Sequence, residues 1–181
     1  MSEFRAAYRY ALALINVAEE MKQLDGISND LEALERLTKE SREFRLFLKS
    51  PVVNKLKKKT VIIEILQYKI NELTMKFVLL LASKDREGLL PEIIQQFYKL
   101  RDQRLGILNV TARTAVAFQP EQERQLVRQL ERATKKKIQM KYIVETSLKG
   151  GFAIQYDDTI WDASVRHQLE ILRGKFAEGT A

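Results

Sequence analysis

Hydrophobic residues recur every three or four positions from residue 4 to about residue 105. This spacing places apolar side chains on one face of an α-helix. The pattern predicts helices over residues 4–24, 27–39, 54–68, 71–83 and 90–104, and a short helical segment around Phe44, Phe47 and Leu48. Six short helices with brief connections predict a compact six-helix bundle.

Residues with strong positional preferences mark the ends of these helices. Asp25-Gly26 is expected to close the first helix, and Ser28 and Asn54 are candidate N-caps because their side-chain oxygens can accept from free backbone amides. Gly106 is expected to stop the last helix of the bundle. The apolar side of the helix that follows Asn54 is expected to carry Leu56, Ile63 and Leu66.

The hydrophobic period changes after Gly106. The segments "ILNVTARTAVAF" (107–118) and "KIQMKYIVE" (137–145) alternate as strands do, and Pro120 opens a helix between them. Gly150-Gly151 and Asp157-Asp158 flank a short strand, "FAIQY", which precedes a second short strand and a final helix from about Ser164. The change of period predicts an α+β chain, with a helical domain over residues 1–105 and a small α/β domain over 106–181.

Two of the predicted helices carry more apolar surface than a bundle helix requires, which is one stripe a little over about 100° wide. In the first helix the two stripes are Phe4, Tyr8, Ala11, Leu12 and Ile15, and Tyr10, Ala13, Leu14, Val17 and Met21. In the fifth they are Leu73, Phe77, Leu80 and Leu81, and Met75, Val78, Leu79 and Ala82. The surplus is either additional core or a groove for an amphipathic partner helix. Periodicity alone does not show which stripe faces inward.

The composition of the chain excludes several kinds of function. The chain has no cysteine, which excludes disulfides and thiolate chemistry. Its N-terminus lacks the pattern of a secretory signal, and its longest apolar run, residues 77–82, is far shorter than the roughly 18 residues of a membrane span. The net charge of +7 and two lysine clusters, at 55–59 and 135–137, fit either solvated surface or a nucleic-acid footprint. Aromatic residues do not alternate with these lysines, so stacking on bases is not indicated.

Patterns of catalytic residues are missing. His167 is the only histidine, and Ser164 three residues earlier would share its exposed helix, so a triad is not indicated. Metal-ligand spacings are also missing. Gly150-Gly151 opens a strand instead of a helix, which argues against a phosphate loop, and Asp157-Asp158 is typical of a hairpin turn. The sequence therefore predicts a non-catalytic protein without a cofactor.

The segment "VETSLKGGFAIQYDDTIWDASVRHQLEIL" resembles the C-terminal signature of the ATP synthase delta subunit family, whose mitochondrial members confer oligomycin sensitivity. The matching positions include Gly150, Gly151, Asp162, Ser164, Val165 and Arg166. "RYALAL" and "FVLLLASKDREGLLPEIIQQFYKL" are similar to the opening of the family's first helix and to a later helical segment. Thr146, Lys149, Tyr156-Asp157 and Ala163 depart from the family pattern at turns.

The resemblance implies a subunit of the peripheral stalk of an F-type ATP synthase. Its helical domain would bind the N-terminal segments of α subunits through helices 1 and 5, and its C-terminal domain would hold the ends of the b subunits. The protein would be a monomer within this complex, peripheral to the cytoplasmic side of the membrane, or to the thylakoid in a plastid. The resemblance assigns the α-subunit groove to Tyr10, Ala13, Leu14, Met75, Val78 and Leu79.

Two expectations complete this interpretation. Leu14→Asp or Val78→Asp is expected to leave the fold intact and to abolish co-purification with the α subunit, because each would bury an unpaired charge in the groove. The principal alternative is a basic, helical, nucleic-acid-associated protein, which would bind with a steep salt dependence. A small enzyme that depends on His167 is a third class.

Overall fold

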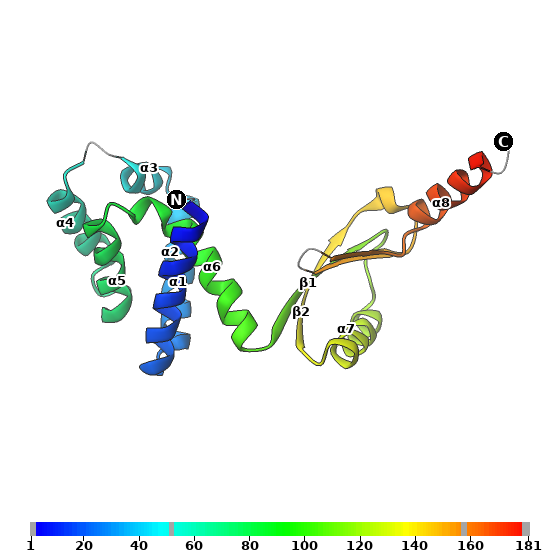
Figure 1. Cartoon of the computed structure of the whole chain (residues 1–181), viewed down its shortest axis with the longest axis horizontal. Coiled ribbons are helices and arrows are strands. Elements are labelled where there is room, and N and C mark those ends of the chain that lie inside the picture. Colours follow the sequence, from blue (N-terminus) through cyan, green and yellow to red (C-terminus); the bar gives the residue numbers. More distant parts are fainter. Residues whose placement is uncertain (1–2, 51–52, 157–158, 179–181) are drawn as a thin grey trace. The chain divides into compact units, whose positions relative to one another are not determined.

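The computed structural model describes residues 3–50, 53–156 and 159–178, which combine helices with a four-stranded sheet (Figure 1). The expected mixed class of helix and sheet is therefore confirmed. The chain divides into two compact units, Met1–Arg101 and Asp102–Ala181. The division falls in the last turn of α6, close to the residue at which the hydrophobic period changes.

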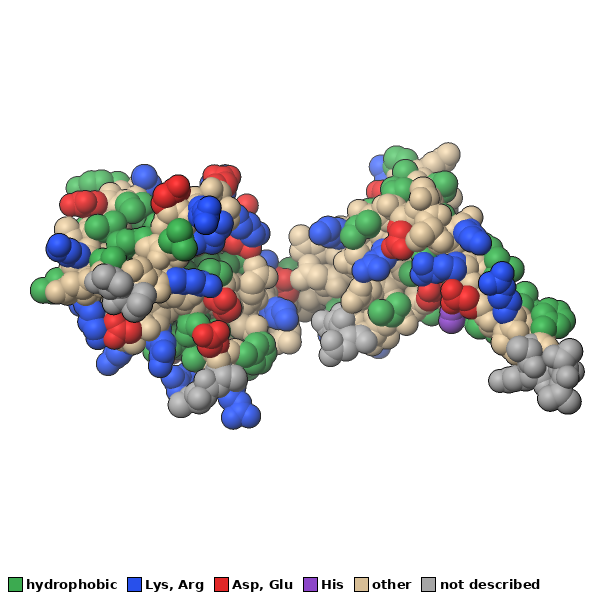
Figure 2. Space-filling model, turned by 90° about the horizontal axis from the view of Figure 1, so that it is seen from above, with side chains coloured by type: hydrophobic (Ala, Val, Ile, Leu, Met, Phe, Trp, Pro, Cys, Tyr) green, Lys and Arg blue, Asp and Glu red, His purple; other side chains and the backbone are tan. Residues whose placement is uncertain are grey.

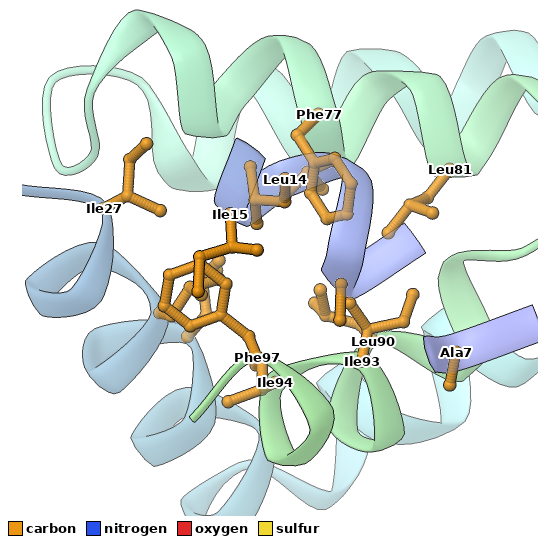
Figure 3. Packing of buried hydrophobic residues seen from close by; sticks show 14 of the residues in the cluster. Ala7, Leu14, Ile15, Ile27, Phe77, Leu81, Leu90, Ile93, Ile94 and Phe97 are labelled. Atoms are coloured by element: carbon orange, nitrogen blue, oxygen red, sulfur yellow. The ribbon is translucent and has the colours of Figure 1, made fainter. Parts of the chain in front are cut away.

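The first unit contains helices that surround one apolar core. In chain order they are α1 (Glu3–Glu20), α2 (Leu24–Glu40), α3 (Arg42–Lys49), α4 (Lys55–Leu66), α5 (Glu72–Ser83), the 3-10 turn η1 (Glu87–Leu89) and α6 (Leu90–Arg104). Ile15 of α1, Ile27 of α2, Leu81 of α5 and Phe97 of α6 are fully buried and converge on this core (Figure 3). Helices α3 and α4 add Phe44 and Ile62 to the same interior.

The first two helices meet at a turn that differs from the predicted one. Helix α1 ends at Glu20 and α2 begins at Leu24, so Asp25-Gly26 lies inside the first turn of α2. The chain reverses at Lys22, whose φ is 54°, instead of at the glycine. Ser28 does not act as an N-cap; its hydroxyl donates to the Leu24 carbonyl oxygen at 2.7 Å. Both predictions were wrong because a non-glycine residue takes the left-handed conformation here.

The caps predicted at Asn54 and Gly106 are confirmed. The Asn54 side-chain oxygen accepts from the Leu56 amide at 3.0 Å, and Gly106 has a φ of 63°. The apolar face predicted for α4 is only partly right, because Leu66 is buried whereas Leu56 is 72% exposed. Lys58 takes the inward position. Its ammonium group pairs with the Glu87 carboxylate of η1 and donates to the Leu48 carbonyl oxygen at 3.4 Å.

The second unit is a sheet with one long helix packed on it. Its elements are β1 (Ile107–Thr114), α7 (Pro120–Thr134), β2 (Lys137–Val144), the 3-10 turn η2 (Thr146–Leu148), β3 (Phe152–Tyr156), β4 (Thr159–Asp162) and α8 (Val165–Glu178). The strand order is β2-β1-β3-β4, with β1 parallel to β2 and the other pairs antiparallel. The predicted strand over 107–118 ends earlier, at Thr114, and the turn predicted at 157–158 lies outside the described residues.

One face of this sheet forms the core of the second unit. Val110 and Ala112 of β1 and Ile154 of β3 pack with Leu126 of α7. Phe118 lies edge-on to both Tyr142 and Phe152, with ring centroids 6.1 and 5.9 Å apart. The alternate residues of β1, such as Asn109 and Arg113, are exposed. The sheet therefore buries the aromatic side and presents a polar side, as strand alternation predicts.

Candidate functional site

An apolar groove runs between α1 and α5, with a cavity of about 350 Å³. We call it the α1–α5 groove, and its lining is Arg9, Tyr10, Ala13, Leu14 and Val17 from α1, with Leu73, Lys76, Phe77 and Leu80 from α5. Leu14 and Phe77 form the floor, since they are only 3% and 8% exposed and lie next to each other (Figure 3). Leu80 is 46% exposed and forms part of the rim. The groove is therefore an apolar surface that the chain leaves open.

The composition of α1 explains why apolar side chains remain outside the core. Its inward face consists mainly of alanines, with Ala7, Ala11 and Ala18 completely buried beside Ile15. Small residues let α1 approach its neighbours closely, and they add little side-chain volume to the core. Neither predicted stripe of α1 is the core face as a whole. Ala11 of the first stripe and Leu14 of the second are buried, whereas Phe4 of the first stripe is 61% exposed.

The rim of the groove is cationic. The Arg9 guanidinium lies 5.7 Å from the centre of the Tyr10 ring, a distance typical of a cation–π contact. On α5, the Lys76 ammonium lies 2.6 Å from the Glu72 carboxylate one turn earlier. This hydrogen bond and the adjacent positive charge hold the pKa of Glu72 below its usual value. An apolar floor with two cations beside it suits an amphipathic helix that carries acidic residues next to its apolar face.

A buried carboxylate on α2 fixes the wall that α5 contributes. Asp30 is 8% exposed, and one oxygen of its side chain accepts from the Asn71 amide at 2.8 Å and from the Thr74 hydroxyl at 2.6 Å. A carboxylate at this position satisfies free amides of the first turn and interacts favourably with the helix dipole. Asp30 therefore sets the start of α5.

The groove contains only half of the residues predicted to line it. Tyr10, Ala13 and Leu14 lie in the groove as expected. Met75, Val78 and Leu79 do not, because Val78 is completely buried and the other two are half-buried against the core. The opposite stripe of α5, with Leu73, Phe77 and Leu80, faces the groove. Sequence reasoning missed these three residues because both stripes are equally apolar.

The signature residues of the second unit position the start of α8. Gly151 has a φ of 72°, and a β-carbon there would lie 2.4 Å from the Ala163 carbonyl oxygen. A β-carbon at Gly150 would lie 2.8 Å from a methyl group of Val165. The Val165 amide donates to the Gly150 carbonyl oxygen at 3.0 Å. Glycine is thus required where the chain before β3 passes against the start of α8.

Asp162 and Ser164 form the cap of α8. The Ser164 hydroxyl accepts from the His167 amide at 3.2 Å, and the Asp162 carboxylate accepts from the Ser164 amide at 2.8 Å. Hydrogen bonds from the Ser164 hydroxyl and amide lower the pKa of Asp162, with smaller contributions from His167 and Arg166. Ser164 is completely buried, so its hydroxyl serves the cap and is not presented to solvent as a nucleophile.

A second set of polar contacts joins the start of α8 to the sheet. Glu145 lies 3.8 Å from Arg113 of β1 and 4.0 Å from Arg166 of α8, and it accepts from the Ser147 hydroxyl at 2.7 Å. The two arginine contacts are exposed ion pairs, which stabilise only weakly. Gly150, Gly151, Asp162, Ser164, Val165 and Arg166 therefore lie together at the base of α8, where their observed contacts are structural.

Clusters of metal ligands and membrane-spanning helices are not found in the described part of the chain. Within residues 3–50, 53–156 and 159–178 there is no group of three or more metal-ligating side chains. In the same ranges, no helix has the length and hydrophobicity needed to cross a bilayer. Two lysines of the 55–59 cluster have acidic partners within the fold. Lys58 is buried and pairs with Glu87, and the Lys55 ammonium lies 2.5 Å from the Asp85 carboxylate.

Comparison with known proteins identifies the family. The sequence profile described as "ATP synthase delta (OSCP) subunit" matches residues 6–176. A protein named ATP synthase subunit delta from Chlorobaculum parvum is 40% identical over 173 residues, which is 96% of this chain and 96% of that protein. Its counterpart from Chlorobium phaeobacteroides strain BS1 is 40% identical over 178 residues, covering 98% and 99%. The chain belongs to the ATP synthase delta (OSCP) subunit family.

A solved structure shows the same fold. A chain in the cryo-EM structure of the Toxoplasma gondii mitochondrial ATP synthase hexamer superposes with a TM-score of 0.69 at 23% identity, covering 94% of this chain and 97% of that one. Membership of the delta (OSCP) family makes the chain a peripheral-stalk subunit of an F-type ATP synthase. The comparisons do not support the nucleic-acid-associated alternative.

Proposed function

We propose that this delta-family subunit is a non-catalytic adaptor that binds two partners through its two units. The first unit, which we take to be the six-helix bundle of residues 1–105, binds the N-terminal segment of an α subunit in the α1–α5 groove. The second, residues 106–181, holds the C-terminal ends of the b subunits. The adaptor lies at the cytoplasmic side of the membrane, or at the thylakoid in a plastid, as a monomer within the complex. It prevents the catalytic head from turning with the rotor.

The observation that supports this proposal is the open apolar floor between α1 and α5. Burial of apolar surface contributes about 25 cal/mol per Å² before the costs of association are subtracted. Leu80 and Ala13 are exposed in the free chain and would be covered by a helix in the groove. The cations Arg9 and Lys76 would then fix the register of an incoming helix through its acidic residues.

The two-partner arrangement also accounts for a site without reactive groups. A stator must resist lateral force, so slow dissociation is the property that its contacts have to supply. Binding two partners through one chain makes the second contact intramolecular and raises the overall affinity through effective concentration. Each surface can therefore be modest in size.

The choice of substitutions follows from the exposure of the groove residues. Leu14 is 3% exposed and Val78 is completely buried, so an aspartate at either position would disrupt the core as well as any binding. Contrary to the expectation from sequence, Leu14→Asp and Val78→Asp should therefore destabilise the fold. Leu80→Glu and Ala13→Glu place the charge on solvent-accessible groove positions instead.

The test compares Leu80→Glu with Leu56→Glu, which alters a leucine of α4 that is 72% exposed and is not part of the groove. The affinity of each variant for a peptide of the α-subunit N-terminal segment is measured by calorimetry. Leu80→Glu is expected to weaken binding by about tenfold or more, because it would bury an unpaired charge, and each tenfold is about 1.4 kcal/mol. Leu56→Glu should bind as the parent does. Equal affinities for all three proteins would remove the groove from the proposal.

A further inference from the structure

A second cavity of the first unit, of about 580 Å³, lies where α3, α4, η1 and the start of α6 meet. We call it the η1 cavity, and its lining includes Leu48 and Lys49 of α3, Lys58 of α4, Glu87 and Leu89 of η1 and Glu92 of α6. Among the described residues, none lines both this cavity and the α1–α5 groove. Small-molecule sites have volumes of about 300–1,000 Å³. The η1 cavity is therefore a separate candidate site, and its size suits a small ligand.

Two buried groups that line the η1 cavity have unused hydrogen-bonding capacity. The side chains of Lys58 and Glu87 are 7% and 3% exposed. One carboxylate oxygen of Glu87 accepts from the Lys58 ammonium group, whereas the other, Oε2, has no hydrogen-bond partner within the described ranges of the chain. An ammonium group has three donors, and contacts to Glu87 and to the Leu48 carbonyl oxygen account for two of those of Lys58. Buried polar atoms are seldom left unpaired, so the pair offers one acceptor and one donor to a ligand.

The charge of this ion pair determines which ligands it favours. A cation bound beside it would be repelled by the Lys58 ammonium group, and an anion would be repelled by the unpaired oxygen of Glu87. Such repulsion is strong in a buried site, because the effective dielectric constant there is lower than in water. A neutral group that both donates and accepts can bond to Lys58 and Glu87 without repulsion.

The rim of the η1 cavity also favours neither sign of charge. Its exposed side chains include two carboxylates, of Glu3 and Glu92, and two cations, of Lys49 and Arg86. Figure 2 views the first unit from the end that carries α3 in Figure 1, and acidic and basic side chains lie next to one another there. Selection by charge therefore comes from the buried pair.

We propose that the η1 cavity binds a neutral small molecule that carries a carboxamide group. The amide nitrogen donates to Oε2 of Glu87, and the amide oxygen accepts from the Lys58 ammonium group. A carboxamide suits this pair because its donor and acceptor are separate atoms that lie in one plane. The half-buried side chains of Val53 and Leu89 also line the cavity and would contact the hydrocarbon part of the ligand.

The first test compares three probes of similar size on the full, unmodified chain. Propionamide is neutral, propionate is an anion and propylammonium is a cation. Each is titrated into the isotopically labelled protein, and the methyl shifts of Leu48 and Leu89 are followed by NMR. We expect saturable shifts with propionamide and binding at least about tenfold weaker for both charged probes. A charged probe that binds as tightly as propionamide would overturn the neutral ligand. If propionamide causes no saturable shift, the proposal fails.

The second test removes the buried pair. Lys58→Met combined with Glu87→Leu keeps an apolar side chain at both positions, and circular dichroism checks that this variant is folded. Its affinity for propionamide should fall by about tenfold or more, because the donor and the acceptor are absent. The matched control, Arg124→Met combined with Glu121→Leu, removes an exposed ion pair of the second unit and should bind as the parent does. Equal affinities of the two double variants would overturn the role of Lys58 and Glu87.

Discussion

The carboxylate of Asp30 accepts a hydrogen bond from the hydroxyl of Thr74 at 2.6 Å, across 44 residues of sequence. The same carboxylate oxygen accepts from the Asn71 amide, so α2 supplies the cap that the Asn71 side chain does not. Because α5 forms one wall of the α1–α5 groove, this contact connects the stability of the first unit to the geometry of the binding surface.

Removal of this cap should destabilise the first unit. Asp30→Ala leaves the Thr74 hydroxyl and the Asn71 amide without their partner, and hydrogen bonds to charged groups contribute about 1.5–3 kcal/mol. Asn29→Ala, at the adjacent exposed position of α2, should change stability by less than about 0.5 kcal/mol. Urea denaturation monitored by circular dichroism measures both values. Equal stability of the two variants would contradict the role given to Asp30.

Breaking the buried ion pair of α4 should lower the free energy of unfolding far more than breaking its exposed ion pair. The side chains of Lys58 and Glu87 are 7% and 3% exposed, and Glu87→Ala would leave a buried ammonium group unpaired, at a cost of about 3–5 kcal/mol. Lys55→Ala breaks the exposed pair with Asp85 and should cost less than about 1 kcal/mol.

A double variant separates the charge from the packing at the buried pair. Lys58→Met combined with Glu87→Leu replaces both charges by apolar groups, and it should recover most of the stability that Glu87→Ala loses. Chemical denaturation of the three variants provides the measurement. A double variant less stable than Glu87→Ala would show that the ion pair itself stabilises α4 against η1.

Replacing Gly151, at the base of α8, should destabilise the fold far more than replacing Gly106, at the end of α6. Gly106 and Gly151 both have positive φ, 63° and 72°, so alanine is strained at either position by about 1–2 kcal/mol. At Gly106 the added β-carbon meets nothing within 4 Å, whereas at Gly151 it would lie 2.4 Å from the Ala163 carbonyl oxygen. Gly151→Ala should therefore lower the thermal midpoint more than Gly106→Ala. A smaller or equal shift for Gly151→Ala would contradict the close approach.

The cap of α8 should weaken in acid. Hydrogen bonds from Ser164 lower the pKa of Asp162 from its ordinary value of 3.8, so the folded state binds this proton less readily than the unfolded state. The stabilisation is therefore present above about pH 4 and is lost as the pH falls through the lower folded pKa. The amide shift of Ser164, followed by NMR, should titrate below 3.8 in the parent and lose this step in Asp162→Asn. A titration at or above 3.8 would contradict the cap.

The hydrophobic period was sufficient to predict most of the fold. The switch from helical to alternating spacing after Gly106 separated the helical segment from the sheet, and Asn54 and Pro120 marked two helix starts correctly. These signals are local, because a cap or a proline acts within its own turn. The turn between α1 and α2 was missed because Lys22 takes a left-handed conformation that sequence composition favours at glycine.

The residues that line the groove could not all be predicted from the sequence. Their exposure depends on contacts between helices, whereas the hydrophobic period records only the spacing of residues along one helix. Both stripes of α5 are apolar, and the choice between Val78 and Leu80 as the exposed residue depends on how α5 packs between α2 and α4. Lys58 was placed in a surface cluster, and its burial was missed because its partner, Glu87, lies 29 residues later. The resemblance assigned Tyr10, Ala13 and Leu14 of α1 to the groove, and all three line it.

The most direct test of the adaptor is a titration of the isotopically labelled full chain with a peptide of the α-subunit N-terminal segment, observed by NMR. We predict that amide and methyl shifts change at groove residues such as Ala13, Leu73 and Leu80, and that Leu80→Glu moves the midpoint of the titration to a peptide concentration at least about tenfold higher. Saturable shifts confined to other helices of the first unit, or no saturable shifts at all, would contradict the account.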